Sequence, residues 1–493
     1  MNVIMVTGIY DLMPSRTLGS YLLRHVLEKR GYTCQVIDHC QEFSADNLFR
    51  LIDHFVDDTT VCVGFSTTFW RDIDQKIWKN DQGLPPNIYE TTRKIKEKYP
   101  NIKIVLGGAG IRNVGNMIEY VDYMVIGEAE DLFPELLDHW TKGTQEPPVK
   151  INSTTGKPFY NQCINKTHDI STCDFQWSER DAIVHGEALP LETARGCIFK
   201  CKFCSYPHLG KKKMDYLKPI SVVKEHIERN HRLWGTKYYL MLDDTFNDSE
   251  YKVNEWLEMT ESLGFDIGWV SYLRADLLHR FPGQAEKLLK SGLKACFFGL
   301  ESLHPTGSQA VGKGWSGRHA REYIPHLIHN IWGDKVNVTN GFICGLPGED
   351  KDSLRSTLEW LNENKLTAHW LGLGISSPAT LAARSLDGVA FTSEFERNAT
   401  SYGYKFDENG WWYNDLWTHK EAAIFAEELN NNRKYKRTIS WTHVQLMGLG
   451  YTEEEAMAWA NSGLRHIEVL MHEDFKKKKR EYLQKYMDKL LSL

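Results

Sequence analysis

Long apolar runs are missing from this chain of 493 residues, and no stretch approaches the length of a transmembrane helix. An excess of basic residues is also missing. The formal net charge is −6, which gives no general attraction for nucleic acid. Residues 1–10 carry no basic leader, so we expect a first strand there and not a secretory signal. These absences favour a cytoplasmic protein without a membrane partner or a nucleic-acid partner.

Cysteine is sparse. The chain has ten cysteines, which are too few for a disulfide framework at this length. Three of them, Cys197, Cys201 and Cys204, lie within eight residues of one another, and this clustering indicates a metal site. The remaining composition, 42% hydrophobic and 25% charged, is typical of a folded globular protein. The length predicts two or three domains.

The first part of the chain alternates between strand patterns and helical patterns. Such alternation predicts a parallel sheet covered by helices on both faces. We therefore expect a doubly wound, Rossmann-like α/β domain over residues 1–144. Residues 145–188 are polar and weakly periodic, and we interpret them as a linker packed on the surface. The predicted strands are 2–7, 33–38, 61–66, 103–106 and 123–126.

A second alternation begins at Leu189. Six successive β-α units predict a partial (β/α)6 barrel over residues 189–380, open because a closed barrel has eight. Beyond it the strand patterns stop, and residues 381–493 are predicted to form a helical domain. The predicted barrel strands are 189–195, 238–242, 267–273, 295–300, 336–344 and 368–375.

The three clustered cysteines form the pattern C-x-x-x-C-x-x-C directly after the first predicted barrel strand. Three thiolates in one short loop leave one iron of a four-iron, four-sulfur cluster without a protein ligand, and that open position suits a cofactor or substrate. A structural zinc site is the alternative, with His208 as a fourth ligand. The barrel context favours the iron–sulfur cluster.

This motif, with the aromatic residue Phe203 before its last cysteine, resembles that of the radical S-adenosylmethionine superfamily. The resemblance extends from about Leu189 to Pro378. It implies a [4Fe-4S] cluster on the three cysteines, whose open iron binds S-adenosylmethionine. It also implies reductive cleavage of this cofactor to a 5′-deoxyadenosyl radical, a small-molecule substrate, and a reductase, flavodoxin or ferredoxin as electron donor.

Short motifs follow the later barrel strands in the order that the family shows. Glycines in the fifth motif, Gly341–Pro347, allow a flat base to approach the backbone. Because side chains alternate along a strand, Cys296 and Cys344 are expected on the opposite face, as small buried hydrophobic residues. By resemblance, the residues that bind S-adenosylmethionine are Phe203, Asp243, Asp244, Arg274, Glu301, Gly341, Ile343 and Gly345.

Residues 1–140 resemble the cobalamin-binding domain that precedes the barrel in one branch of this superfamily. The resemblance implies cobalamin beyond the carboxyl ends of the strands. A D-x-H-x-x-G loop is absent, and we interpret His39 as a surface histidine. A domain of the same fold without a corrin stays open as an alternative. The residues that would contact cobalamin are Ser66, Gly107, Gly108, Gly127 and Glu128.

Together the two resemblances imply a cobalamin-dependent methyltransferase acting on an unactivated carbon or phosphorus centre. The alternatives are a radical cyclase, rearrangement or oxidation enzyme without methyl transfer, and a structural zinc-binding protein. The aromatic residues Trp411–Tyr413 and Trp417 suit either a lid over a substrate or core packing. The lysine runs 211–213 and 476–480 are interpreted as solvated surface. No catalytic residue beyond the cofactor ligands is predicted.

Overall fold

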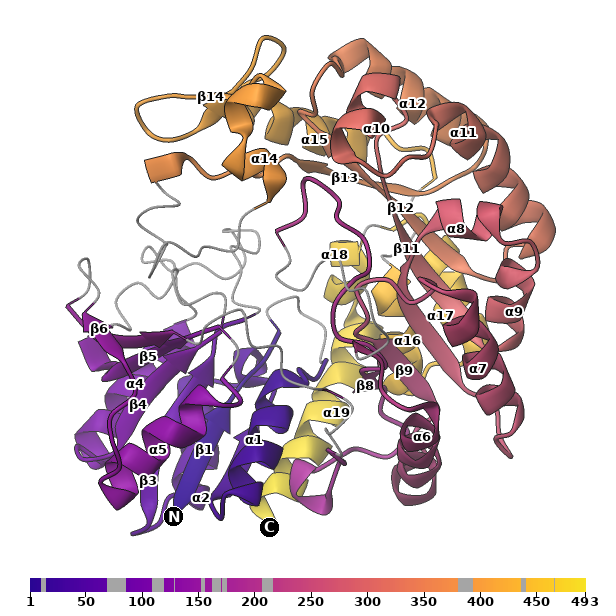
Figure 1. Ribbon diagram of the computed structural model, residues 1–493. Coiled ribbons are helices and arrows are strands. Elements are labelled where there is room, and N and C mark those ends of the chain that lie inside the picture. The colour runs from indigo at the N-terminus through magenta and orange to yellow at the C-terminus, as the bar shows by residue number, and fades with distance from the viewer. Residues whose placement is uncertain are drawn as a thin grey trace. The chain divides into compact units, whose positions relative to one another are not determined.

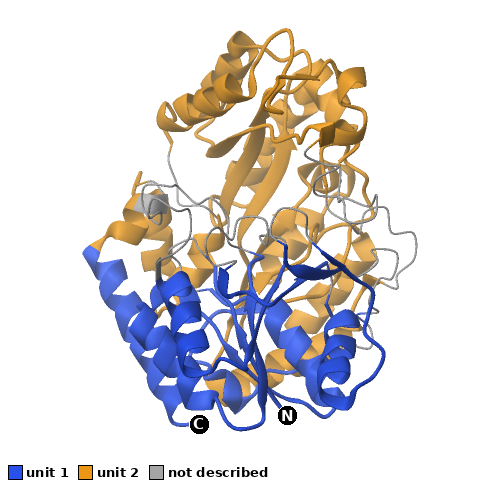
Figure 2. Ribbon diagram, turned by 90° about the vertical axis from the view of Figure 1, so that its left-hand side faces the viewer, with its two compact units in different colours: residues 1–190, 473–493 blue, residues 191–472 orange. Residues whose placement is uncertain are grey.

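The computed structural model separates into two compact units (Figure 2). Unit 1 comprises Met1–Pro190 and Glu473–Leu493, and unit 2 comprises Leu191–His472. Among the described residues, no helix is both long and apolar enough to cross a membrane. The structure describes residues 1–9, 15–68, 86–108, 119–127, 129–151, 156–161, 170, 175–205, 216–379, 393–435, 440–464 and 466–493.

Unit 1 is built on a seven-stranded sheet in the order β2-β1-β3-β4-β5-β7-β6 (Figure 1). The parallel part, β2-β1-β3-β4-β5, has the order of a doubly wound sheet whose direction of winding reverses between β1 and β3. The Rossmann-like fold predicted from the sequence is confirmed. The strands are β1 (Asn2–Val6), β2 (Thr33–Ile37), β3 (Thr60–Ser66), β4 (Lys103–Gly107), β5 (Tyr123–Ile126), β6 (Val149–Ile151) and β7 (Pro158–Asn161).

Helices cover this sheet. Every residue of β1 is buried, as expected for a central strand enclosed on both faces. The second helix begins where the Ser44 side chain accepts a hydrogen bond from the amide of Asn47, a standard N-cap. The helical segments of unit 1 are α1 (Gly19–Lys29), η1 (Cys40–Glu42), α2 (Ala45–Phe55), α4 (Pro86–Lys98), α5 (Leu132–Lys142), η5 (Glu179–Asp181) and α19 (Glu473–Leu491).

The segment predicted as a linker, residues 145–188, contributes to the sheet of unit 1. Strand β7 pairs in parallel with β5, and β6 pairs antiparallel with β7. Phe159 and Tyr160 of β7 are buried. The expectation of a simple linker was therefore wrong for these residues. Strands of three and four residues are too short to produce a clear apolar period, which explains why the pattern was missed.

The last helix, α19, belongs to unit 1, although the sequence predicted it within a separate helical domain of residues 381–493. The Tyr486 hydroxyl accepts a 2.8 Å hydrogen bond from the amide of Asp38. The Tyr482 hydroxyl lies 2.9 Å from Nε2 of His39, and Lys479 forms a 2.6 Å ion pair with the buried Glu42. The lysine run is thus only partly solvated surface, because one of its members is paired in the interior.

His39 is fully buried, which corrects the expectation of a surface histidine. Its backbone is left-handed, with φ of 58°. Burial, aided by the charges of Arg16 and Lys479, holds the pKa of His39 well below its usual value. The imidazole is therefore neutral in the folded protein and binds to the C-terminal helix.

The second sheet has six strands in the order β13-β12-β11-β10-β9-β8, so neighbours in sequence are neighbours in space. It belongs to unit 2 except for the first two residues of β8, Leu189 and Pro190. The pairings from β9 to β13 are parallel. Helices follow these strands in the connections, as in a partial barrel, and the predicted (β/α)6 fold is confirmed. The strands are β8 (Leu189–Leu191), β9 (Tyr238–Met241), β10 (Gly268–Leu273), β11 (Leu293–Glu301), β12 (Asn337–Cys344) and β13 (Ala368–Gly372).

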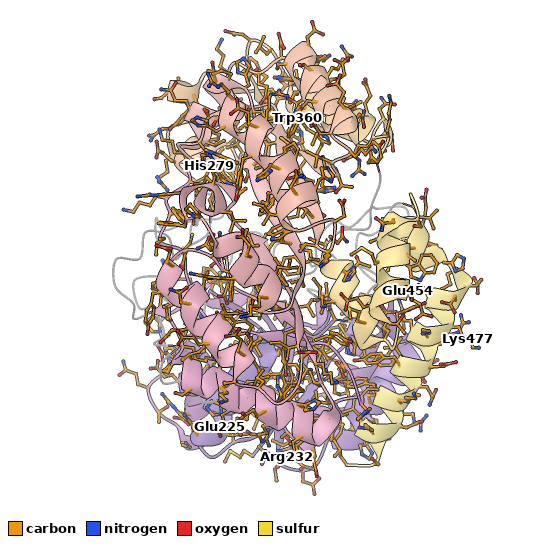
Figure 3. The ribbon with its side chains drawn as sticks, turned by 90° about the vertical axis from the view of Figure 1, so that its right-hand side faces the viewer. Glu225, Arg232, His279, Trp360, Glu454 and Lys477 are labelled. Atoms are coloured by element: carbon orange, nitrogen blue, oxygen red, sulfur yellow. The ribbon has the colours of Figure 1, made fainter. Side chains whose placement is uncertain are left out.

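Figure 3 looks onto the helices of these connections, with Glu225 and Arg232 on α6, His279 on α8 and Trp360 on α12. The inward faces of these helices are apolar and pack on the strands. The helical segments of the connections are α6 (Ile220–Trp234), α7 (Glu250–Glu261), α8 (Ala275–Arg280), α9 (Gln284–Lys290), α10 (Pro305–Val311), α11 (Gly317–Pro325), the π-helical η7 (His326–Ile331) and α12 (Lys351–Glu363).

The rest of unit 2 includes a two-stranded antiparallel sheet of β14 (Lys405–Phe406) and β15 (Trp412–Tyr413), within a region predicted to be helical. Trp412 and Trp417 are buried, which favours core packing over a lid for these two residues. Helix α16 contacts four consecutive strands, β9 to β12. The helical segments here are α14 (Glu394–Arg397), η8 (Ala399–Tyr402), α15 (His419–Asn431), α16 (Ser440–Gly448), α17 (Glu453–Asn461) and α18 (His466–Met471).

Candidate functional site

The cysteine loop directly follows β8. Cys197 is buried, Cys201 and Cys204 are partly exposed, and the amide of Cys204 donates a 3.1 Å hydrogen bond to the carbonyl of Cys201. None of the three forms a disulfide. In the described residues, no three His, Cys, Asp or Glu side chains are arranged to hold a metal ion. A four-iron cluster instead takes each cysteine on a different iron, so the donor set suits that group.

Arg274, at the end of β10, lies against this loop. Its Nη1 is 3.6 Å from Sγ of Cys201, and its guanidinium carbon lies 4.0 Å from the centre of the Phe199 ring. Asp276 fixes the guanidinium from the other side through hydrogen bonds of 3.0 and 2.7 Å. The arginine predicted as a cofactor ligand therefore contacts the cysteine loop directly, where a cation stabilises thiolates.

The two aspartates after β9 differ in their surroundings. Asp243 is fully buried, and its carboxylate accepts hydrogen bonds from the amides of Thr193 and Ala194 and from the Thr193 hydroxyl. It also forms a 2.5 Å ion pair with Lys252 of α7. These contacts join the end of β8 to α7 and use the acceptor positions of Asp243.

Asp244 lies at a bend after β9 and is partly exposed. Its charge acts on the thiol of Cys197, together with burial, to raise the pKa of that thiol. The hydroxyl of Thr245 lies 3.7 Å from Sγ of Cys197. Of the predicted aspartate pair, Asp244 is thus the residue near the cysteine loop.

Glu301 ends β11 in a left-handed conformation, with φ of 66°. This is unusual for a residue other than glycine and accompanies a register shift against β12. Oε1 of Glu301 forms a 2.7 Å ion pair with Lys313, and Lys313 lies 5.7 Å from the centre of the Phe203 ring. The carbonyl of Lys313 accepts a 3.2 Å hydrogen bond from Arg274.

Lys313 was not predicted from the sequence, although it links Glu301, Phe203 and Arg274. The sequence feature that could have indicated Lys313 is its position between two glycines, Gly312 and Gly314. Both glycines have a positive φ in the structure. Glycines on both sides allow a tight loop that presents one lysine, but such a pattern is also common in plain turns.

The glycines of the fifth motif are required by close packing. A Cβ at Gly341 would lie 2.5 Å from the ring of Phe297, and one at Gly345, where φ is 98°, would lie 2.5 Å from Trp412. Ile343 is partly exposed on the same face of β12 as Gly341. Cys296 and Cys344 are fully buried on the opposite face, as predicted.

In unit 1, the predicted cobalamin residues lie at the carboxyl ends of adjacent strands. Ser66 is in register with Gly107, and both are partly exposed. Gly108 and Gly127 have φ of 98° and 89°, and a Cβ at Gly108 would meet the Thr68 amide at 2.8 Å. Glu128 lies outside the described residues, as do His208 and Lys211–Lys213. Small residues therefore lie together at the carboxyl ends of β3, β4 and β5.

Comparison with known proteins bears on both units. The Radical SAM superfamily model matches residues 191–361. An uncharacterized methyltransferase of Pyrococcus horikoshii is 23% identical over 307 residues, 59% of this chain and 64% of that protein. The bacteriochlorophyllide d C-12(1)-methyltransferase of Chlorobaculum tepidum is 22% identical over 249 residues, 49% of this chain and 50% of that protein. The chain thus spans half to two-thirds of the length of these relatives.

Two solved structures share the fold over nearly the whole chain. The radical S-adenosylmethionine methyltransferase TsrM from Kitasatospora setae has a TM-score of 0.62 at 16% identity, with 98% of this chain and 99% of that chain covered. The cobalamin-dependent radical enzyme OxsB has a TM-score of 0.58 at 15% identity, with 99% and 80% covered. The resemblance predicted from the cysteine motif is confirmed. Residues 191–361 thus form a radical S-adenosylmethionine domain, and the cofactors of that domain family are a [4Fe-4S] cluster and S-adenosylmethionine.

Proposed function

We propose that this protein is a cobalamin-dependent methyltransferase of the radical S-adenosylmethionine superfamily. The observation that carries the proposal is the combination of a radical domain with a doubly wound sheet in the order β2-β1-β3-β4-β5. Open sheets of this kind bind ligands beyond the carboxyl ends of their strands. Relatives named as methyltransferases, and the fold shared with TsrM, support methyl transfer as the reaction.

The residues at the strand ends of unit 1 fit a large planar group such as a corrin. Ser66, Gly107 and Gly127 are small and partly exposed. Larger side chains at these three positions would occupy the space directly beyond the sheet. When bound, cobalamin would supply a cobalt centre that carries a methyl group.

In unit 2, we propose that Cys197, Cys201 and Cys204 hold the cluster, which supplies the electron for cleavage of S-adenosylmethionine. Arg274 would balance the negative charge of the thiolates. Glu301 would orient the cofactor, while Lys313 holds the Glu301 carboxylate in place. Asp244, whose charge acts on the Cys197 thiol, is the candidate for a cofactor contact at this strand end.

The proposal includes a cytoplasmic location and a reducing protein partner such as a flavodoxin or ferredoxin. None of the eight described cysteines forms a disulfide, which agrees with a reducing compartment.

Replacement of Glu301 by alanine is expected to weaken binding of S-adenosylmethionine by about tenfold, because a charge-assisted hydrogen bond is worth roughly 1.5–3 kcal/mol. Equilibrium dialysis of the reconstituted protein with labelled cofactor measures this. Iron content should not change. Glu322→Ala on α11, which removes an exposed glutamate of the same unit, is the control. Equal affinity in the Glu301 variant and the wild type would contradict the assignment.

Cobalamin bound to unit 1 is expected to have no histidine beneath its cobalt. The turn from Gly8 to Gly19 contains no histidine, and the ring of His39 is buried against Tyr482. Electron paramagnetic resonance of the cobalt(II) form should therefore lack nitrogen superhyperfine splitting from an imidazole. Splitting of that kind would refute the ligand prediction.

The methyl-transfer proposal itself is tested by product mass. A metabolite extract incubated anaerobically with the loaded enzyme should contain a species heavier by one methylene unit. Loss of hydrogen without added mass would instead favour a radical oxidation or cyclisation.

A further inference from the structure

The two faces of the unit 2 sheet can be distinguished from ring contacts on β10. Trp269 packs against Trp256 of α7, with ring centres 5.7 Å apart. Tyr272 packs against Trp441 of α16, with ring centres 4.7 Å apart. Because successive side chains point to opposite faces, α7 covers the outer face and α16 lies on the inner face of the partial barrel.

Tyr272, Phe297 and Trp441 form a continuous group on this inner face, which we call the aromatic wall. The Tyr272 and Phe297 rings are 5.5 Å apart at an angle of 72°, and Tyr272 meets Trp441 at 63°. The ring of Phe297 in turn rests against the backbone of Gly341. The three side chains of the wall come from β10, β11 and α16, and Tyr272 remains accessible to solvent.

Accessible apolar surface extends from the wall to both sides. Tyr272 is 42% exposed, Leu242 43% and Leu371 56%. Leu371 is in register with Ile343, and Leu240, two residues before Leu242, is in register with Val270. These pairings put all three on the inner face. A folded protein exposes such a set of apolar side chains together where a ligand covers them.

Helix α16 covers part of the inner face of the sheet. The amide of Ser440 donates a 3.2 Å hydrogen bond to Oγ1 of Thr339, an inner-face residue of β12. Trp441 follows directly. The helix thus forms a floor, and the exposed ring of Tyr272 lies above it, toward the strand ends that carry the cysteine loop, Arg274 and Glu301.

The aromatic wall itself consists of three side chains that carry no charge near pH 7. His369 is in register with Gly341, and burial, with the charge of Arg433, lowers the pKa of His369 to about 4. Its imidazole is therefore neutral near pH 7. Two pairs of charged groups lie at the strand ends, Arg274 with Asp276 and Lys313 with Glu301.

We propose that the aromatic wall binds the substrate, and that the substrate is a planar conjugated ring system, uncharged on the side that meets Tyr272 and Trp441. An aromatic ring at 42% exposure offers a surface for offset or edge stacking. The inference rests on the proposed function in that it names the substrate class of the same site. Tyr272 and Trp441 then determine specificity.

The test compares two neutral probes of similar ring size, 2-naphthol and its saturated analogue decahydro-2-naphthol. Equilibrium dialysis is done anaerobically on the full chain with cluster and S-adenosylmethionine bound, so that the adenine position is occupied. The wild type should bind 2-naphthol about tenfold more tightly than the saturated probe, since stacking favours the aromatic ring. Tyr272→Ala should lose most of this preference, and Tyr272→Phe should keep it.

Tyr251→Ala is the matched control, because Tyr251 is 55% exposed on α7, the helix of the outer face. It should leave both affinities unchanged. Trp441→Leu serves as a second variant if Tyr272→Ala does not fold. Equal binding of the two probes, binding of neither, or a Tyr272→Ala protein with full preference would each overturn the proposal. Because dialysis needs no turnover, a failure of methyl transfer alone would leave this result intact.

Discussion

Cys201→Ala is expected to abolish cleavage of S-adenosylmethionine and to lower the iron content sharply after anaerobic reconstitution. Sγ of Cys201 lies 3.6 Å from Nη1 of Arg274. Alanine has no donor atom that could replace the thiolate on iron. Chromatographic measurement of 5′-deoxyadenosine gives the cleavage rate, and iron, sulfide and zinc analysis gives the metal content. The same result is expected for Cys197→Ala and Cys204→Ala.

Cys296→Ala is the matched control, because Cys296 is buried on the outer face of β11 and contacts neither the loop nor Arg274 in the described interactions. It should keep both iron and cleavage. A full cleavage rate in any of the three loop variants would overturn the assignment of the cluster. One zinc per chain without sulfide would instead favour the structural zinc alternative.

Asp243→Ala is expected to destabilise unit 2 by about 3–5 kcal/mol, because it leaves Lys252 as an unpaired buried charge. The side chains of both partners are almost fully buried, with 0% and 7% exposed. The variant also removes the acceptor for the amides of Thr193 and Ala194, which position the strand before the cysteine loop. Urea denaturation followed by tryptophan fluorescence measures the loss, since most tryptophans lie in unit 2.

Asp352→Ala provides the comparison on α12 of the same unit. Asp352 is 91% exposed and pairs with Arg355 at 3.4 Å, so its loss should cost well under about 1 kcal/mol. If Asp243→Ala kept full stability and lost only affinity for S-adenosylmethionine, Asp243 would be a cofactor ligand after all.

The fold could be predicted from the sequence to the extent that its strands are long and regular. The inner and outer faces of β11 and β12 followed from alternation alone, which is why the burial of Cys296 and Cys344 was predicted correctly. The structure also distinguishes Asp243, which is buried, from Asp244, which is partly exposed at a bend after β9. The prediction treated the two aspartates as a pair because the resemblance to the family motif does not indicate where each side chain points.

Other features depend on contacts between distant residues. Lys313 reaches Glu301 only because the chain turns back after α10. No local pattern in the sequence indicates that these two residues come into contact. The aromatic wall joins residues from positions 272, 297 and 441. A pattern within a short stretch of sequence cannot predict contacts between residues so far apart. The C-terminal tryptophans could therefore be interpreted only as core residues or as a lid over a substrate.

The position of α19 affects when unit 1 can complete its fold during translation. Residues 191–472 are translated between the two parts of unit 1. At about 5–20 residues per second, this interval is on the order of tens of seconds. Throughout it, the surface around His39 and Asp38 lacks the tyrosines that later cover it. Unit 1 therefore stays incomplete until residues 191–472 and α19 have been translated.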